Sequence, residues 1–265
     1  MKRSVSAHLV LDIDARTDLV FAIAAAVPTT GEIDERLSIV ADGVELEPVE
    51  LTDPHGSRMH HLVAEAARLT IDYSATVTGR SAAIPLAPLD EIIYLRPSRY
   101  AESDILFPTA RAEFSGLTGR DLLAGVSSWV GSHLRYVPGS SQPTDGARDT
   151  LLDRQGVCRD YAHLVVALLR ALDVPARLVS VYAPGLDPMD FHAVAEAYID
   201  DAWHVVDATA LAPRQSLLRI ATGRDAADTA FLTNHGGNVF LRELQVSAVV
   251  DELPVDDVRD FVSLG

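Results

Sequence analysis

Cysteine is nearly absent from this chain, since Cys158 is the single cysteine among 265 residues. One cysteine cannot form an intramolecular disulfide, so a disulfide-dependent secreted scaffold is excluded and a reducing compartment fits. A zinc site would have to rest on histidines and carboxylates, and the chain has no His-Glu-x-x-His segment. Phosphate-binding and dinucleotide-binding glycine motifs are also missing. We therefore expect neither a metal nor another cofactor.

Positive charge and long apolar runs are scarce as well. The formal net charge is −16, from 38 acidic and 22 basic residues, and such a field repels phosphate backbones and anionic lipid headgroups. No apolar run reaches transmembrane length, and the apolar stretch near the N-terminus is interrupted by Asp12 and Asp14, unlike a signal peptide. The sequence predicts a soluble, cytoplasmic protein that binds neither nucleic acid nor a membrane.

The first hundred residues carry short alternating or β-rich runs separated by turn signals. This pattern is typical of an antiparallel sandwich, with runs at 8–13, 44–49 and 69–77. The stretch 85–107 contains Pro85, Pro88 and Pro97 and has few positions at helical or strand spacing, so it is interpreted as a connection. The prediction is an N-terminal β-sandwich domain over residues 1–100.

Beyond residue 100 the apolar period becomes helical before it becomes strand-like again. Helices are expected over 122–134 behind a cap at Thr118, from Thr144 or Asp145 onward, and over 158–172. Strands are expected over 176–182, 193–199 and 203–208. Helices followed by an antiparallel sheet predict an α+β domain over residues 101–265.

Cys158 is expected in the first turn of the third of these helices, just after Gly156. Unpaired N–H groups and the positive end of the helix dipole favour an anion there, and Arg159 adds a positive charge. A catalytic cysteine needs such help, because a free thiol has a pKa of about 8.5 and attacks only as thiolate. A small buried hydrophobic residue is the competing interpretation, and position alone does not separate the two.

His192 and Asp207 belong to two predicted strands that are separated by a turn at 200–201. If this turn has two residues, Val194 lies opposite Asp207, and Asp207 becomes the diagonal neighbour of His192 on the same face. A three-residue turn would place the two side chains on opposite faces. With a two-residue turn the set is complete: Cys158 as nucleophile, His192 as base and then acid, and Asp207 to fix the imidazole tautomer.

Three motifs resemble those of the bacterial transglutaminase-like superfamily, whose members are often described as cysteine proteases. Residues 156–164, Gly-Val-Cys-Arg-Asp-Tyr-Ala-His-Leu, resemble its nucleophile motif; 191–196 resemble its histidine motif and 203–209 its aspartate motif. The resemblance runs from about Leu117 to Phe231, includes Thr222 to Asp228, and extends to the β-rich N-terminal part. It implies a papain-like core. Many members have tryptophan where this chain has Val194, so the family's pocket wall does not carry over to this position, whereas the triad is unaffected.

The resemblance implies thiol-dependent acyl transfer or hydrolysis on a peptide or carboxamide, with a peptide or protein as substrate. The sequence leaves the acceptor, water or an amine, open. Gln155 is the nearest amide side chain upstream of the nucleophile, and we take it as the candidate oxyanion donor. A non-catalytic binding or assembly protein that keeps the same fold is the alternative.

Overall fold

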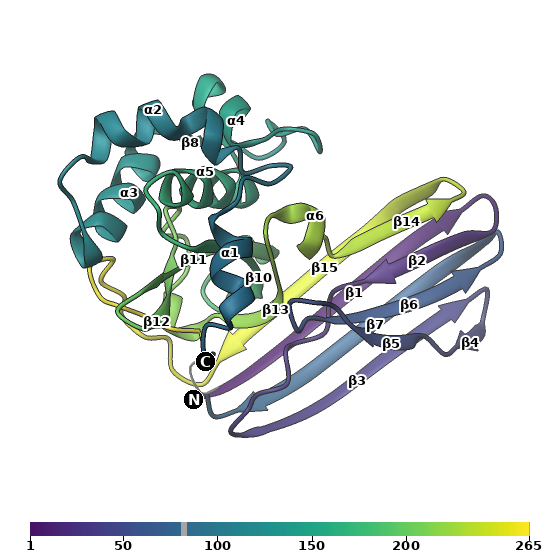
Figure 1. The fold of residues 1–265 in the computed structure, drawn as a ribbon. Helices are drawn as coiled ribbons and strands as arrows, with labels where there is room; N and C mark the ends of the chain where they lie inside the picture. The colour runs from purple at the N-terminus through teal and green to yellow at the C-terminus, as the bar shows by residue number, and fades with distance from the viewer. Residues whose placement is uncertain (81–83, 265) are drawn as a thin grey trace.

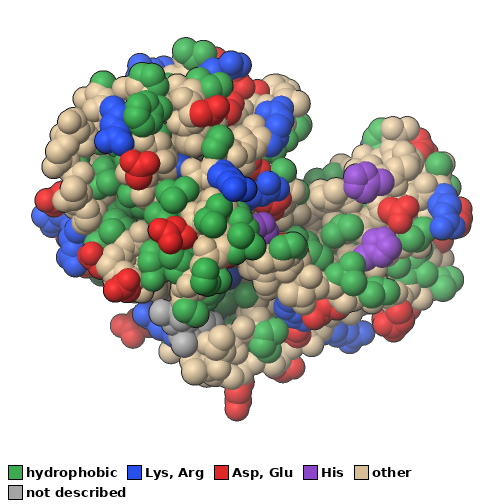
Figure 2. Space-filling view, in the orientation of Figure 1, with side chains coloured by type: hydrophobic (Ala, Val, Ile, Leu, Met, Phe, Trp, Pro, Cys, Tyr) green, Lys and Arg blue, Asp and Glu red, His purple; other side chains and the backbone are tan. Residues whose placement is uncertain are grey.

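The computed structural model describes residues 1–80 and 84–264. Two parts meet along one side of the molecule: a sandwich of long strands, and a group of helices packed on a shorter sheet (Figure 1). The space-filling view shows a notch between them (Figure 2). The structure thus has the α+β class and the two types of layer that the sequence predicts.

Two antiparallel sheets form the sandwich. The larger runs in the order β15, β1, β7, β3, β4, with β1 at Lys2–Ile13, β3 at Glu32–Ala41, β4 at Val44–Leu46, β7 at Ala67–Thr78 and β15 at Val239–Val250. The smaller runs in the order β14, β2, β6, β5, with β2 at Thr17–Phe21, β5 at Val49–Thr52, β6 at Arg58–Ala64 and β14 at Leu232–Gly236. Alternate residues of β1 are buried, as a strand with one face on the core requires.

Two strands that follow the predicted division at residue 100 pack in the N-terminal sandwich. β15 pairs with β1 and β14 pairs with β2, so residues 232–250 complete the N-terminal sandwich. Alternating hydrophobicity marks a strand and its buried face, but it does not name the strand's partner, which here lies more than 200 positions away in sequence. The division into domains at 1–100 and 101–265 stays a prediction, and β14 and β15 belong to the second range in sequence while they pair with the first in space.

Helices replace part of the connection expected over 85–107. α1 spans Pro88–Leu95 and α2 spans Ser103–Phe114. Pro88 is the first helical residue of α1, where its missing N–H costs no hydrogen bond and its fixed φ suits the helix. Pro108 lies inside α2 but only six residues into it. Proline usually marks the end of a helix, but Pro88 and Pro108 both lie within helices here.

The helix α5, Cys158–Arg170, forms the centre of the second part. Eleven of its residues are buried, and α2, α3 (Gly119–His133), α4 (Ala147–Asp153) and the strand β11 pack around it. The sheet runs in the order β12, β11, β10, β13, with β10 at Ala176–Tyr182, β11 at Phe191–Ile199, β12 at Ala202–Val206 and β13 at Leu218–Gly223. Short elements complete this part: β8 at Arg135–Tyr136, β9 at Gln155–Gly156, a 3-10 turn at Arg214–Ser216 and α6 at Ala226–Thr229.

The expected helices and strands of this part are present with shifts of a few residues. The helix expected from Thr144 or Asp145 begins at Ala147, and Thr118 takes the cap position of α3 with extended backbone but without a side-chain hydrogen bond. Across residues 1–80 and 84–264, no helix has both the length and the apolar character needed to cross a membrane.

Candidate active site

Cys158 is the first residue of α5, as predicted, and its thiol is free and half-buried. The chain reaches it through β9, which pairs in parallel with β8 so that Gly156 lies beside Tyr136. Asp160 folds back over the helix start, and its Oδ2 accepts a hydrogen bond of 2.8 Å from the Val157 N–H. A Cβ atom on Gly156 would lie 2.7 Å from the Asp160 Cβ, so the cap requires glycine at this position.

The turn between β11 and β12 has two residues, which confirms the register predicted from the sequence. Ile199 pairs with Ala202 and Ala195 with Val206, so the same register continues to Val194 opposite Asp207. The two turn residues, Asp200 and Asp201, have φ angles of 51° and 59°. Paired left-handed residues are typical of the tight hairpin turns that match the twist of the strands, and aspartate is among the residues that tolerate this conformation.

The hairpin brings His192 and Asp207 together inside the protein. His192 Nε2 lies 3.0 Å from Asp207 Oδ2, and both residues are buried. The second carboxylate oxygen of Asp207 accepts hydrogen bonds from the Thr209 N–H at 2.9 Å and the Thr209 hydroxyl at 2.7 Å. The other ring nitrogen, His192 Nδ1, is buried and has no hydrogen-bond partner within the protein. It is therefore available to Cys158, which lines the same cavity as His192.

Charge at this pair favours the imidazolium form. Burial alone would lower the pKa of His192, but the Asp207 carboxylate, its hydrogen bond and the nearby Cys158 raise it to about 10. Burial would raise the pKa of Asp207, but the charge and hydrogen bond of His192, together with Thr209, hold it below its usual value. An acid–base pair that keeps a proton on imidazole beside a thiol is suited to stabilising thiolate.

Cys158 and His192 open onto one cavity of about 240 Å³, which we call the active-site pocket. Its wall is mostly hydrocarbon and is contributed by both parts of the molecule: Ala22, Leu178, Phe191, Ile220, Phe231 and Leu244. A larger hollow of about 540 Å³ lies on the polar outer face of the five-stranded sheet, but it contains neither Cys158 nor His192. The candidate active site is therefore the smaller, apolar cavity.

Tyr136 is a residue near the thiol that the sequence reasoning missed. Its ring packs at 5.9 Å from that of Tyr161, one turn along α5 from Cys158. Burial raises the pKa of Tyr136 to about 12, and the charge and side-chain hydrogen bonding of Cys158 contribute to the rise. A two-residue strand carries too little periodicity to be recognised, so no signal in the sequence placed Tyr136 beside Cys158.

Gln155 has no contact that supports the predicted oxyanion role. Its side-chain carbonyl lies 3.5 Å from an Arg135 guanidinium nitrogen, and Gln155 does not line the active-site pocket. Val194, the departure from the family pattern, also lies elsewhere, because it is buried with Val179 and Val181 in a separate apolar cluster. The part of the chain that the structure describes contains no group of three or more His, Cys, Asp or Glu residues arranged for a metal ion.

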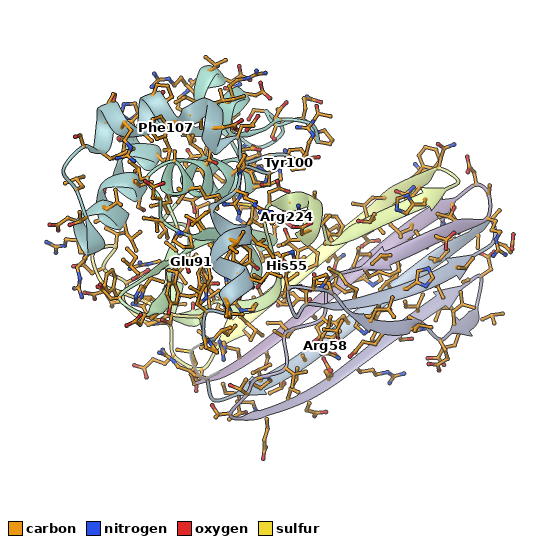
Figure 3. All side chains as sticks on the ribbon, viewed as in Figure 1. His55, Arg58, Glu91, Tyr100, Phe107 and Arg224 are labelled. Carbon is orange, nitrogen blue, oxygen red and sulfur yellow. The ribbon has the colours of Figure 1, made fainter. Side chains whose placement is uncertain are left out.

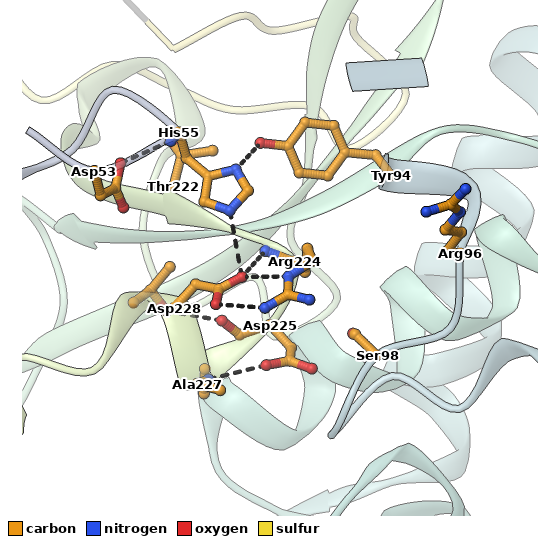
Figure 4. Close-up of polar contacts among 12 residues, drawn as sticks. Asp53, His55, Tyr94, Arg96, Ser98, Thr222, Arg224, Asp225, Ala227 and Asp228 are labelled. Carbon is orange, nitrogen blue, oxygen red and sulfur yellow. Dashed lines mark hydrogen bonds and ion pairs between the residues drawn. The ribbon is translucent and has the colours of Figure 1, made fainter. Parts of the chain in front are cut away.

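A polar junction lies on the α6 side of the pocket, which Ala226 and Thr229 line. Figure 3 labels two residues of this junction, His55 and Arg224, where the helical part meets the sandwich. His55, in the turn between β5 and β6, reaches from the sandwich and hydrogen bonds through Nδ1 with the Tyr94 hydroxyl at 2.8 Å (Figure 4). Its Nε2 lies 3.4 Å from Asp228 of α6, which also receives two hydrogen bonds from the Arg224 guanidinium. Within the segment 222–228, Arg224 and Asp228 thus help to hold α6 in place beside the pocket.

A cysteine at a helix start beside a histidine–carboxylate pair on an adjoining hairpin is the arrangement of the thiol enzymes. Residues 117–208 match the model of the transglutaminase-like superfamily. The crystal structure of a candidate cysteine protease from Cytophaga hutchinsonii is 33% identical, with a TM-score of 0.90, and the match covers 98% of this chain and 95% of that one. The chain belongs to the transglutaminase-like superfamily.

Curated relatives give a family context without an activity. An uncharacterized protein of Mycobacterium leprae is 29% identical over 119 residues, which make up 42% of this chain and 43% of that protein. An uncharacterized protein of Mycobacterium tuberculosis is 36% identical over 74 residues, 26% of this chain and 24% of that protein. The matches thus span less than half the length of these relatives.

Proposed function

We propose that this protein is a cysteine-dependent enzyme that transfers or hydrolyses an acyl group of a peptide or carboxamide through a thioester on Cys158. One observation carries the proposal: a helix-start thiol and a buried His192–Asp207 pair meet at a single apolar pocket. Each of these residues alone has an ordinary structural explanation. Their convergence is what a nucleophile, a base and an orienting carboxylate require.

The proposed reaction begins when the Cys158 thiolate attacks the substrate carbonyl carbon and a tetrahedral oxyanion forms. His192 then gives its Nδ1 proton to the leaving amine, the C–N bond breaks, and the thioester remains. Water or a second amine next attacks the thioester, His192 removes the proton of this nucleophile, and the Cys158 thiolate leaves. Throughout, Asp207 accepts the Nε2–H of His192, which keeps the ring in the orientation that presents Nδ1 to the thiol.

The oxyanion requires hydrogen-bond donors on the side of the carbonyl away from His192. The Cys158 backbone N–H belongs to the first turn of α5, where no intrahelical acceptor exists. Hydrogen bonding by this N–H acts on the Tyr136 hydroxyl and lowers its pKa, against the larger effect of burial. We assign the oxyanion site to this N–H and to the Tyr136 hydroxyl. Preorganised donors of this kind are usually a large part of the rate enhancement in acyl transfer.

A non-catalytic binding or assembly role is the competing function. It would leave Cys158 as a small packing residue with the reactivity of an ordinary thiol. Labelling with an activated thiol probe at neutral pH separates the two, because only an ion-paired Cys158 should react much faster than a free thiol. Equal rates for the protein and for a free thiol would favour the binding role.

The substrate and the compartment are part of the proposal. We place the protein in the cytoplasm, where a single free cysteine stays reduced, and we expect a peptide or protein substrate rather than nucleic acid or a membrane. The net charge of −16 favours substrates that are neutral or positively charged.

The decisive experiment incubates the protein with mixed peptides and a primary amine and follows the products by mass spectrometry. Hydrolysis adds one water to a cleaved or deamidated product, whereas transfer joins the amine to the acyl group. Folded Cys158→Ala is the control and should give neither product. If this variant formed the same products at the wild-type rate, the thioester mechanism would be excluded.

A further inference from the structure

Among the described residues, every arginine, histidine or acidic side chain that lines the active-site pocket forms an ion pair within the protein, with one exception. Arg159 donates to the Ser141 hydroxyl, the Gln142 carbonyl and the Asp160 carboxylate. The Ser180 hydroxyl accepts a hydrogen bond from the Ala221 N–H, and Thr229 bonds back to its own helix. The charge of Arg159 is therefore paired, and the two hydroxyl groups carry no charge.

Asp190 is the exception. It lines the pocket two residues before His192, and one of its carboxylate oxygens accepts a hydrogen bond of 2.7 Å from the Phe191 N–H. Among residues 1–80 and 84–264, no lysine or arginine forms an ion pair with it. The side chain reaches solvent, but partial burial raises the pKa of its carboxyl group, against the opposing effects of that hydrogen bond and of His192.

The charges around the pocket add up to a negative site. The Arg159 guanidinium lies against Asp160, and the imidazolium of His192 faces both Asp207 and Cys158. Asp190 then contributes one uncompensated carboxylate at the edge of a wall that is otherwise hydrocarbon. A ligand with an apolar side chain and a nearby cation complements this combination, and an anionic ligand does not.

We propose that Asp190 binds a protonated amino group of the acyl donor while an apolar side chain of the donor fills the active-site pocket. This inference rests on the proposed function and adds a substrate class to it: apolar peptides that carry an ammonium group within a few bonds of the attacked carbonyl. The ammonium can be the free N-terminus of the peptide or a lysine side chain. Both have the same chemistry, and the experiment below separates them.

The first test needs no known substrate. The second-order alkylation rate of Cys158 is measured with bromoethylammonium, iodoacetamide and iodoacetate, which are positive, neutral and negative, for the wild type and for Asp190→Asn. We expect the preference for the cation over the anion to fall roughly 10-fold in Asp190→Asn. Glu47→Gln, which removes an exposed carboxylate from the loop between β4 and β5, is the charge-matched control and should keep the wild-type preference.

The second test uses three peptides of one apolar sequence: one with a free N-terminus, one N-acetylated, and one N-acetylated with lysine beside the attacked carbonyl. The wild type should favour one of the two charged peptides in kcat/KM, which identifies the source of the ammonium. Asp190→Asn should lose roughly 10-fold on that peptide and leave the neutral one unchanged.

Two results would overturn the inference while leaving the proposed function intact: an unchanged alkylation preference in Asp190→Asn, or an equal loss on charged and neutral peptides, which would show that Asp190 acts through His192. If the alkylation preference falls as expected but no peptide is turned over, the cation site stands and the proposed function fails.

Discussion

His192 Nε2 lies 3.0 Å from Asp207 Oδ2, although fourteen residues and a hairpin turn separate the two in the chain. The contact is a diagonal one across two antiparallel strands, and it exists because the turn has an even number of residues. Thr209 occupies the other carboxylate oxygen, so Asp207 cannot rotate away from the ring without losing two further hydrogen bonds. The orientation of His192 is therefore built into the backbone register.

Asp207→Asn tests this relationship directly. The amide keeps the shape but removes the charge that stabilises imidazolium, and we expect kcat/KM to fall on the order of 10- to 1,000-fold, less than the roughly 10⁴-fold loss seen in a serine triad. A thiolate needs less help from its base than a hydroxyl does. Turnover of the best peptide from the screen is the measurement, and wild-type activity in folded Asp207→Asn would rule out the triad.

Insertion of one residue between Asp200 and Asp201 should be more damaging than the point substitution. A turn of three residues would move the Asp207 side chain to the opposite face of the sheet or force the hairpin to rearrange. We expect loss of activity together with a lower melting temperature, because Val205 and Val206 would also leave their apolar clusters. Insertion between Glu47 and Pro48, in the loop after β4, is the matched control and should retain activity.

Cys158→Ala should abolish acyl transfer and leave the fold intact. The thiol is only half-buried, so its removal costs little packing, and we expect the melting temperature to change by less than about 4 °C. Activity and thermal unfolding are measured on the same preparation. A collapse of the melting temperature would instead identify Cys158 as a packing residue.

The pH dependence of thiol alkylation reports on the ion pair. His192 keeps its proton up to its raised pKa of about 10, so imidazolium is present throughout the neutral range and the Cys158 alkylation rate should stay high well below pH 8.5. In His192→Ala this positive charge is gone, and the profile should move to higher pH. Superimposable profiles for the two proteins would remove the basis for the ion pair.

Tyr136→Phe removes the proposed oxyanion donor and nothing else from the ring. We expect kcat to fall about 10- to 100-fold while KM changes little, because the lost hydrogen bond forms in the transition state. Gln155→Leu is the comparison, since Gln155 makes no contact with the pocket and should keep activity within a few-fold. The opposite ranking of the two variants would return the oxyanion role to Gln155.

The sequence predicted the local parts of the site because local rules control them. Cys158 begins its helix because the Asp160 carboxylate caps the helix start and Gly156 leaves room for it. Asp207 reaches His192 because Asp200 and Asp201 form a tight two-residue turn. Tyr136 and the pocket wall could not be predicted in this way. Ala22 and Leu244 lie more than 200 positions apart in sequence, and their meeting depends on strand partners that periodicity does not specify.

Residues 101–265 produced alone test the predicted division of the chain. β14 and β15 would lose β2 and β1, which are their neighbours in the two sheets, so both strands would be left without a strand partner, and the pocket would lose Ala22. We expect this fragment to aggregate or to lack activity in gel filtration and peptide assays. A monomeric, active fragment would show that the division at residue 100 is a true domain boundary.

Strand β15 also sets an order of events during synthesis. Leu244 lines the active-site pocket, and β15 finds its place only against β1, which leaves the ribosome first and must wait for it. A nascent chain that has already released Cys158, His192 and Asp207 therefore still lacks one wall of its pocket. The pocket beside Cys158 therefore gains its complete wall only after residues 239–250 have left the ribosome.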